Sequence, residues 1–145
     1  MDQKDAMEIA NLWKYPDQYS FYDMTEDVDD YNEIVDPKQR ENYFSIKENG
    51  SLIGYFVVDS NDDSVTLGLG MRPELTGQGK GESFLNYIIS FIVKKYKPTK
   101  IKLSVVDFNK RAMKVYKKCG FKETGTSMLP SNGSVFNFVH MERKL

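Results

Sequence analysis

Residues 65–92 read VTLGLGMRPELTGQGKGESFLNYIISFI, and they predict a strand, a glycine-rich loop and a helix in succession. The β-branched and aliphatic residues 65–71 favour a strand, which Arg72 and Pro73 end. A helix is predicted after the loop because apolar residues recur at spacings of three and four and so share one face. These residues are Phe84, Leu85, Ile88, Ile89 and Ile92.

The glycine-rich loop between them is suited to an anion. Glycines at alternate positions let backbone N–H groups point into one concavity, and the start of a helix attracts negative charge. The Rossmann fingerprint requires G-x-G-x-x-G, and a P-loop requires Ser or Thr where Gly81 stands, so neither nucleotide motif fits. Taken alone, the loop is also compatible with a flexible connection that binds nothing.

Two ordered motifs resemble the GCN5-related N-acetyltransferase (GNAT) superfamily. Its pyrophosphate segment, R/Q-x-x-G-x-G/A, is matched at Gly79 and Gly81, although Thr76 stands where Arg or Gln is usual. The preceding Met71-Arg72-Pro73 resembles the family's V-x-P. A second pattern, N-x-x-A-x-x-x-Y-x-x-x-G-F, is matched in residues 109–121, NKRAMKVYKKCGF. The resemblance extends over roughly residues 5–143.

The resemblance implies an α/β (α+β) fold of GNAT type. Its mixed central sheet is flanked by helices and splayed at the site of acetyl-CoA, the expected co-substrate. Only Met1 to Lys4 precede the first predicted helix, so the family's first strand is expected to be short or missing.

The resemblance also assigns roles to residues of the two motifs. Asn109, which is predicted to cap a helix, would also hydrogen-bond the pantetheine arm. Tyr116, otherwise a packing residue, would donate a proton or hydrogen bond to the departing thiolate. The strand backbone would pair with the arm and the loop amides would hold the pyrophosphate, at Leu69, Gly70, Met71, Gly77, Gln78, Gly79, Lys80, Gly81 and Glu82.

No general base is predicted. Ser104 stands where ribosomal-protein N-terminal acetyltransferases of this superfamily carry a glutamate, and a serine cannot act as that base. An α-amino acceptor is partly neutral at cellular pH and needs only a water relay. His140, the only histidine, and Cys119 are interpreted as structural residues. Lys80, Lys110 and Arg111 either meet the phosphates of CoA or are solvated.

Composition indicates one domain, residues 1–145, with 40% hydrophobic residues. The net charge of −1, the single cysteine, and the lack of a long apolar run or signal pattern favour a cytoplasmic protein that binds neither nucleic acid nor membrane. No metal site is predicted, and a homodimer is possible.

Elsewhere the patterns predict helices over 4–13 and 23–35, a hairpin of strands 43–48 and 52–58 turning at Asn49-Gly50, and a strand at 100–106. A hairpin of 121–128 and 135–141, joined through residues 130–133, closes the chain. The expected order is α-α-β-β-β-α-β-α-β-β.

The acceptor pocket has no motif. The aromatic residues Tyr19, Phe21 and Tyr22 either line it or pin a loop to the core. The helix that follows has seven carboxylates and no Lys or Arg between Asp23 and Asp36, including Asp29 and Asp30. That helix is either a solvated face or a source of attraction for a cationic acceptor.

These observations predict an N-acetyltransferase that moves acetyl from acetyl-CoA to a primary amine, either a small molecule or a protein N-terminus, by direct attack in a ternary complex. The alternative is a catalytically silent acyl-CoA-binding regulatory module. A nucleotide-binding module is disfavoured because both nucleotide motifs fail.

Overall fold

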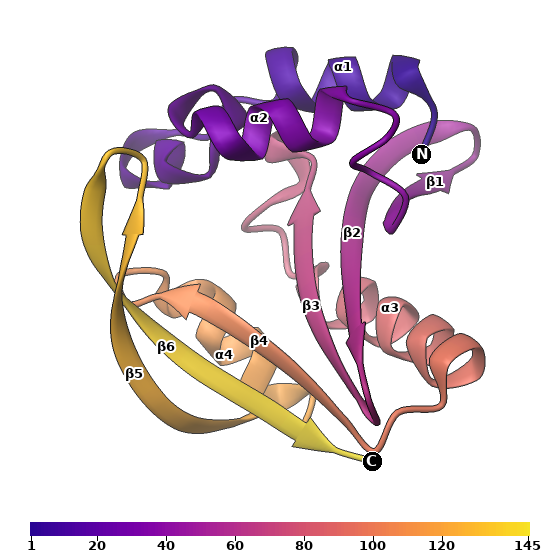
Figure 1. Ribbon diagram of the computed structural model, residues 1–145, viewed down its shortest axis with the longest axis vertical. Helices are drawn as coiled ribbons and strands as arrows, with labels where there is room; N and C mark the ends of the chain where they lie inside the picture. The colour runs from indigo at the N-terminus through magenta and orange to yellow at the C-terminus, as the bar shows by residue number, and fades with distance from the viewer.

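The computed structural model describes all residues, 1–145, and its centre is a mixed six-stranded sheet in the order β1-β2-β3-β4-β6-β5 (Figure 1). The strands are β1 (Tyr43–Glu48), β2 (Ser51–Asn61), β3 (Ser64–Met71), β4 (Lys100–Val106), β5 (Lys122–Ser131) and β6 (Ser134–Lys144). The helices are α1 (Gln3–Leu12), α2 (Val28–Val35), α3 (Gly81–Tyr96) and α4 (Lys110–Lys118), with short 3₁₀ turns η1 (Asp17–Tyr22), η2 (Met24–Glu26) and η3 (Pro73–Leu75). The predicted fold class and element order are confirmed.

Two apolar clusters cover opposite faces of the sheet. The larger joins α3 and α4 to the strands through buried residues such as Phe56, Val58 and Ile88. The smaller joins α1 and α2 to β1 and β2, and Tyr55 and Val57 pack against it. Alternate residues of β2 therefore serve different clusters, as the pleat of a strand requires. No helix is both long and apolar enough to span a membrane.

The start of the chain agrees with the prediction in one respect and differs from it in another. The sheet begins only at β1, after both N-terminal helices, so the missing first strand is confirmed. The second helix does not start at Asp23, whose carboxylate accepts the backbone N–H of Tyr15 at 2.8 Å. Asp27 caps the helix instead, because its carboxylate accepts the N–H groups of Asp29 and Asp30.

The closing hairpin is longer than predicted. Its turn is the two-residue Asn132-Gly133, both with positive φ, as at Asn49-Gly50 in the first hairpin. Pro130, expected in the turn, lies within β5 opposite Val135. The ladder tolerates it because β5 pairs with a neighbour on one side only.

The middle of the sheet is splayed. β3 and β4 run parallel but pair only at Ser64↔Lys100, Val65↔Ile101 and Thr66↔Lys102, while β2 accompanies β3 to Met71. The closed end is fastened by the N–H of Thr99, which donates to the carbonyl of Asp63 at 2.6 Å. Beyond Thr66 the two strands diverge like the arms of a V (Figure 1). The predicted splay is therefore present, and the facing edges of the two strands are left without a strand partner.

Candidate active site

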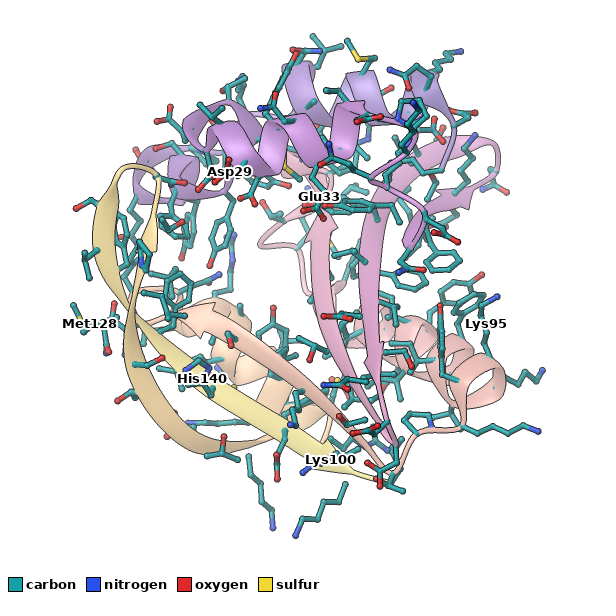
Figure 2. The ribbon with its side chains drawn as sticks, viewed as in Figure 1. Asp29, Glu33, Lys95, Lys100, Met128 and His140 are labelled. Carbon is teal, nitrogen blue, oxygen red and sulfur yellow. The ribbon has the colours of Figure 1, made fainter.

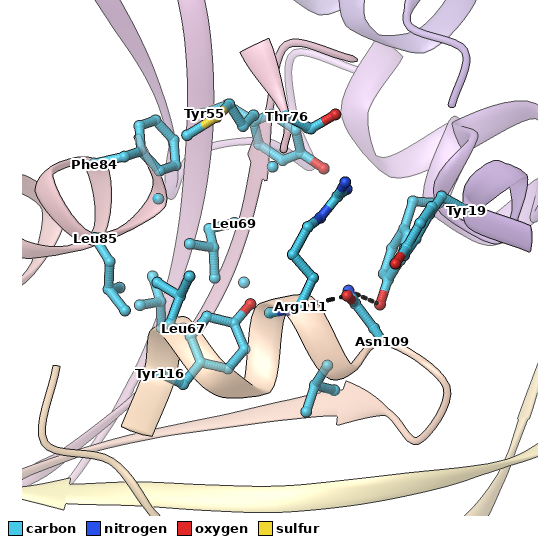
Figure 3. Close-up of a pocket in the computed structure, with 18 of the residues that line it drawn as sticks. Tyr19, Tyr55, Leu67, Leu69, Thr76, Phe84, Leu85, Asn109, Arg111 and Tyr116 are labelled. Atoms are coloured by element: carbon cyan, nitrogen blue, oxygen red, sulfur yellow. Dashed lines mark hydrogen bonds between the residues drawn. The ribbon is translucent and has the colours of Figure 1, made fainter. Parts of the chain in front are cut away.

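A cavity of about 560 Å³ lies where β3 and β4 separate. The glycine loop, the start of α3, one face of α4 and the aromatic segment around η1 close it (Figure 3). Its walls include most residues that the two motifs predict: Leu69, Gly70, Met71, Gly77, Gly79, Gly81, Glu82, Asn109 and Tyr116. One concave site thus collects side chains from segments far apart in the sequence.

The glycine loop is shaped for an anion. Gly77 and Gly79 have φ values of +72° and +75°, which side-chain-bearing residues rarely adopt. No side chain caps the start of α3, so its first N–H groups are not held by the protein's own side chains. At Gly81 a Cβ would lie 3.1 Å from Val115 of α4, so glycine there allows α3 and α4 to approach. The loop therefore has the backbone shape and the N–H groups that an anion site requires.

Thr76 does not weaken the loop. Its hydroxyl donates to the carbonyl of Pro73 at 2.7 Å and so stabilises the turn that leads into the glycines. Arg111 of α4 reaches across to the loop, where its guanidinium would lie 3.0 Å from a Cβ at Gly77. The Arg111 guanidinium also stacks over the ring of Tyr19, 4.5 Å from its centroid.

Tyr116 projects from α4 into the cavity, opposite Leu67 and Leu69 of β3 (Figure 3). Burial, and to a smaller degree the neighbouring Tyr22, raises the pKa of the Tyr116 phenol well above its ordinary value. The hydroxyl is consequently protonated at all physiological pH values and is available as a donor.

Asn109 has two roles. Its side-chain oxygen accepts the N–H of Ala112 at 3.1 Å and caps α4, as predicted. Its side-chain N–H donates to the hydroxyl of Tyr22 at 2.8 Å (Figure 3). Burial raises the pKa of Tyr22 to about 12, although the bond from Asn109 opposes the rise. Asn109 therefore ties α4 to the aromatic segment.

The aromatic residues around η1 have both of the predicted roles: some line the cavity, and one pins the loop to the rest of the protein. Tyr19 and Tyr22 line the cavity. Phe21 does not: its ring packs edge-on against Phe108 and Phe136, with centroids 5.7 and 4.8 Å away, and pins the segment to the closing hairpin. The expectation that Phe21 binds the acceptor is not supported by its position.

The acidic helix contributes one carboxylate to the cavity. Asp30 lines it, whereas Asp29 lies on α2 outside the lining (Figure 2). Although Asp30 is exposed at the mouth, partial removal of its water raises its pKa to about 6, and repulsion from Asp27, Glu33 and Asp29 adds to the rise. The site therefore holds a carboxylate that gains by meeting a cation.

Three further motif residues, Gln78, Lys80 and Lys110, do not line the cavity. The Gln78 side chain donates to the carbonyl of Glu74 at 2.7 Å. Lys80 and Lys110 are exposed and are not part of the lining. Side-chain roles for these residues are therefore unsupported, while the backbone of residues 78 and 80 remains part of the loop. Cys119 is buried, as its interpretation as a structural residue requires.

Sequence reasoning missed two tyrosines of the site. The Tyr15 hydroxyl donates to the carbonyl of Met71 at 2.7 Å, at the open end of β3. Tyr55 of β2 lies opposite Gly70, where any Cβ would collide with its ring. Only the strand register reveals why residue 70 is glycine: the missing side chain accommodates Tyr55.

Ser104 lines the cavity from β4, and its hydroxyl is 2.7 Å from Nδ1 of His140. The structure contains no group of three or more His, Cys, Asp and Glu side chains arranged to hold a metal ion.

Comparisons with known proteins agree with this geometry. A family profile described as "Acetyltransferase (GNAT) family" matches residues 6–121. A chimera of the Vibrio cholerae spermidine N-acetyltransferase has a TM-score of 0.74 and 23% identity, over 99% of this chain and 92% of that one. A GNAT-family acetyltransferase from Bacillus anthracis has a TM-score of 0.76 and 15% identity, over 99% and 91%.

A ribosomal-protein alanine N-acetyltransferase from Escherichia coli has a TM-score of 0.60 and 22% identity, over 72% of this chain and 70% of that one. At these identities the likeness establishes a shared fold. No curated protein matches the sequence significantly.

Proposed function

Because this chain belongs to the GNAT acetyltransferase family, which uses acetyl-CoA as co-substrate, we propose that it acetylates a cationic primary amine by direct attack in a ternary complex. The observation that carries the proposal is a single cavity that joins three features. These are the open edges of β3 and β4, the uncapped start of α3 beside the glycine loop, and the phenol of Tyr116, which lines the cavity.

The chemistry needs a neutral amine, a polarised carbonyl and a protonated leaving group. The nitrogen lone pair forms a bond to the thioester carbon, and the C–S bond breaks as the tetrahedral adduct collapses. Sulfur keeps the electron pair and takes a proton, while nitrogen loses its proton to a base or to water. Tyr116 supplies the hydrogen bond or proton to sulfur, and N–H groups at the β3 edge polarise the carbonyl oxygen.

The charge at the mouth supports a cationic acceptor. Asp30 opens onto the cavity, and Asp27, Asp29 and Glu33 surround it, so an approaching ammonium group meets a negative potential. Tyr19 and Tyr22 provide aromatic walls. The neighbour named for spermidine acetylation acts on a polycation, which agrees with this chemistry.

Acetyl-CoA is expected to bind, and ATP or NAD at equal concentration is not expected to displace it. The strand edges and the phenol match a thioester arm, whereas the loop lacks the spacing of either nucleotide motif. Isothermal titration calorimetry with each ligand measures this. Tighter binding of ATP than of CoA would contradict the assignment of this cavity to acetyl-CoA.

Asp30→Asn is expected to lower kcat/KM for a dicationic amine about tenfold at low salt and to remove much of its salt dependence. An exposed carboxylate attracts a cation over a Debye length of about 10 Å at 0.1 M salt and about 3 Å at 1 M. The measurement is CoA thiol release with polyamines, aminoglycosides, amino acids and short peptides. Asp59→Asn, an exposed carboxylate on β2 outside the cavity, is the control.

The same variant also tests the pKa of Asp30. Because folding raises that pKa from 3.8 to about 6, the folded state loses stability as the pH rises through this window. Asp30→Asn should therefore increase the melting temperature at pH 7 relative to wild type and leave it nearly unchanged at pH 3.5. Preference for anionic acceptors, or equal activity of Asp30→Asn at all salt concentrations, would show that the acidic helix is only solvated surface.

The silent regulatory module is disfavoured, since the chain belongs to an enzyme family and places a phenol in the cavity. A cytoplasmic location and a homodimer stay predictions of the sequence.

A further inference from the structure

Three side chains on neighbouring strands form a hydrogen-bonded row beside the cavity. The Ser104 hydroxyl on β4 lies 2.7 Å from Nδ1 of His140 on β6, and Nε2 of His140 lies 2.5 Å from the Ser127 hydroxyl on β5. Ser104 and His140 are directly opposite in the β4–β6 ladder. Both ring nitrogens of the only histidine are thus engaged.

When the imidazole is neutral, one of its ring nitrogens donates a hydrogen bond and the other accepts one. With the proton on Nε2, that N–H donates to Ser127, and Nδ1 accepts the hydroxyl of Ser104. In this tautomer Ser127 supports the imidazole by accepting the Nε2–H, and Nδ1 is left as an acceptor toward Ser104. The lone pairs of the Ser104 oxygen are then available to the cavity.

The row also connects two hollows of the molecule. Ser104 lines the main cavity, while Ser104 and His140 both line a second cavity of about 200 Å³ that includes Thr66, Thr124 and Glu142. Figure 2 shows His140 in the half-sheet of β4, β6 and β5, which forms one arm of the V. A proton taken up by His140 therefore has a route that does not return through the acyl site.

We infer that Ser104 and His140 together act as the general base of acetyl transfer, with Ser127 as the residue that positions the imidazole. This inference rests on the proposed function. Ser104 removes a proton from the acceptor ammonium as its own hydroxyl proton passes to Nδ1 of His140. The neutral amine then attacks the thioester, and the imidazolium releases its proton to solvent through the second cavity.

The hydrogen bond between Ser104 and His140 would supply the base that a carboxylate at position 104 would otherwise provide. A serine alone is too weak a base, but a serine bonded to an imidazole can pass its hydroxyl proton to the ring nitrogen that accepts the hydrogen bond. The charged groups around His140 are Lys102 of β4 and Glu142 of β6, with Lys100 lying 3.9 Å from Glu142. Glu142 supports the imidazolium, and Lys102 opposes it.

The test compares His140→Gln, Ser104→Ala and Ser127→Ala with wild type over pH 5.5 to 9. We expect His140→Gln and Ser104→Ala each to lower kcat about 10²-fold near pH 7, within the usual range for acid–base catalysis. Both should lose the rise of kcat/KM with pH that a general base produces. Ser127→Ala should lose less activity than the other two variants, because it removes only the hydrogen-bond partner of Nε2 and leaves Ser104 and His140 in place. Acetyl-CoA affinity, measured by calorimetry, should stay unchanged in all three.

Two further variants sharpen the comparison. Ser104→Glu in the His140→Gln background should recover activity and shift the rise to lower pH, because a carboxylate then serves as base. Thr126→Val is the control, since Thr126 is exposed on β5 next to Ser127 but lies outside both cavities and outside the row. It should stay within about twofold of wild type.

Nuclear magnetic resonance provides a readout that is independent of turnover. The single histidine allows its ring nitrogens to be assigned without ambiguity, and the free protein should show the Nε2–H tautomer. A predominant Nδ1–H tautomer, or a His140→Gln variant with wild-type rate and pH profile, would overturn the inference. Wild type that releases no thiol with any amine would instead overturn the proposed function.

Discussion

Tyr116→Phe is expected to lower kcat about 10²-fold or more while the affinity for acetyl-CoA stays nearly unchanged. The variant keeps the ring, which packs 6.2 Å from Phe121 between centroids, and removes only the hydroxyl. Because burial raises the pKa of the phenol, the hydroxyl is a protonated donor, and its loss leaves the departing thiolate unsupported. Steady-state kinetics at saturating acceptor measure the effect.

The control is Tyr87→Phe, which removes the hydroxyl of a tyrosine that is 63% exposed on α3. It should retain wild-type kinetics. Both variants should have melting temperatures close to that of wild type. Equal turnover of Tyr116→Phe and wild type would reduce Tyr116 to a packing residue.

Gly79→Val should weaken acetyl-CoA binding by one to two orders of magnitude. The φ of +75° at this position costs a side-chain-bearing residue roughly 1–2 kcal/mol, and a β-branched residue more. The loop can relieve that strain only by turning its N–H groups away from the pyrophosphate. A Cβ at Gly79 meets no other atom within 4 Å, so the damage comes from backbone conformation and not from a collision.

Gly50→Val provides a matched control. Gly50 has a similar φ of +82° and also has open space around it, but it lies in the β1–β2 turn, away from the cavity. The two variants should lose comparable stability, and only Gly79→Val should lose affinity in calorimetry. Gly81→Val is a poorer test, because its side chain would collide with Val115 of α4. Unchanged acetyl-CoA binding by Gly79→Val would exclude the loop from the site.

The fold was predictable where local pattern and tertiary packing agree. Residues 65–92 form the expected strand, loop and helix, because the apolar face of α3 is also the face that the core buries. The prediction failed at Asp23, which has the residue type of a cap but is drawn into a contact with Tyr15. Within α2, apolar residue type did not predict burial either, because Val28 is 72% exposed while Ile34 is fully buried.

The site was most predictable where residues belong to a motif, although Tyr19, Tyr22 and Asp30, which belong to none, also line the cavity. The glycine loop, Asn109 and Tyr116 are local signals and line one cavity. Tyr55 and His140 have no local signal, because their roles follow from strand register: Tyr55 opposes Gly70, and His140 opposes Ser104, 36 residues away. Such pairs become visible only when the order of strands is known.

The splayed sheet also links the lifetime of the protein to its metabolic surroundings. The half-sheets β1-β2-β3 and β4-β6-β5 are joined by three residue pairs, so the seam between them is the least supported part of the sheet. A ligand that binds only the folded chain across this seam adds about 2.7 kcal/mol to stability at a hundred times its dissociation constant. We therefore expect the seam to open more often, and proteases to reach it more readily, when acetyl-CoA is scarce. The supply of co-substrate would then govern how long the enzyme survives as well as how fast it works.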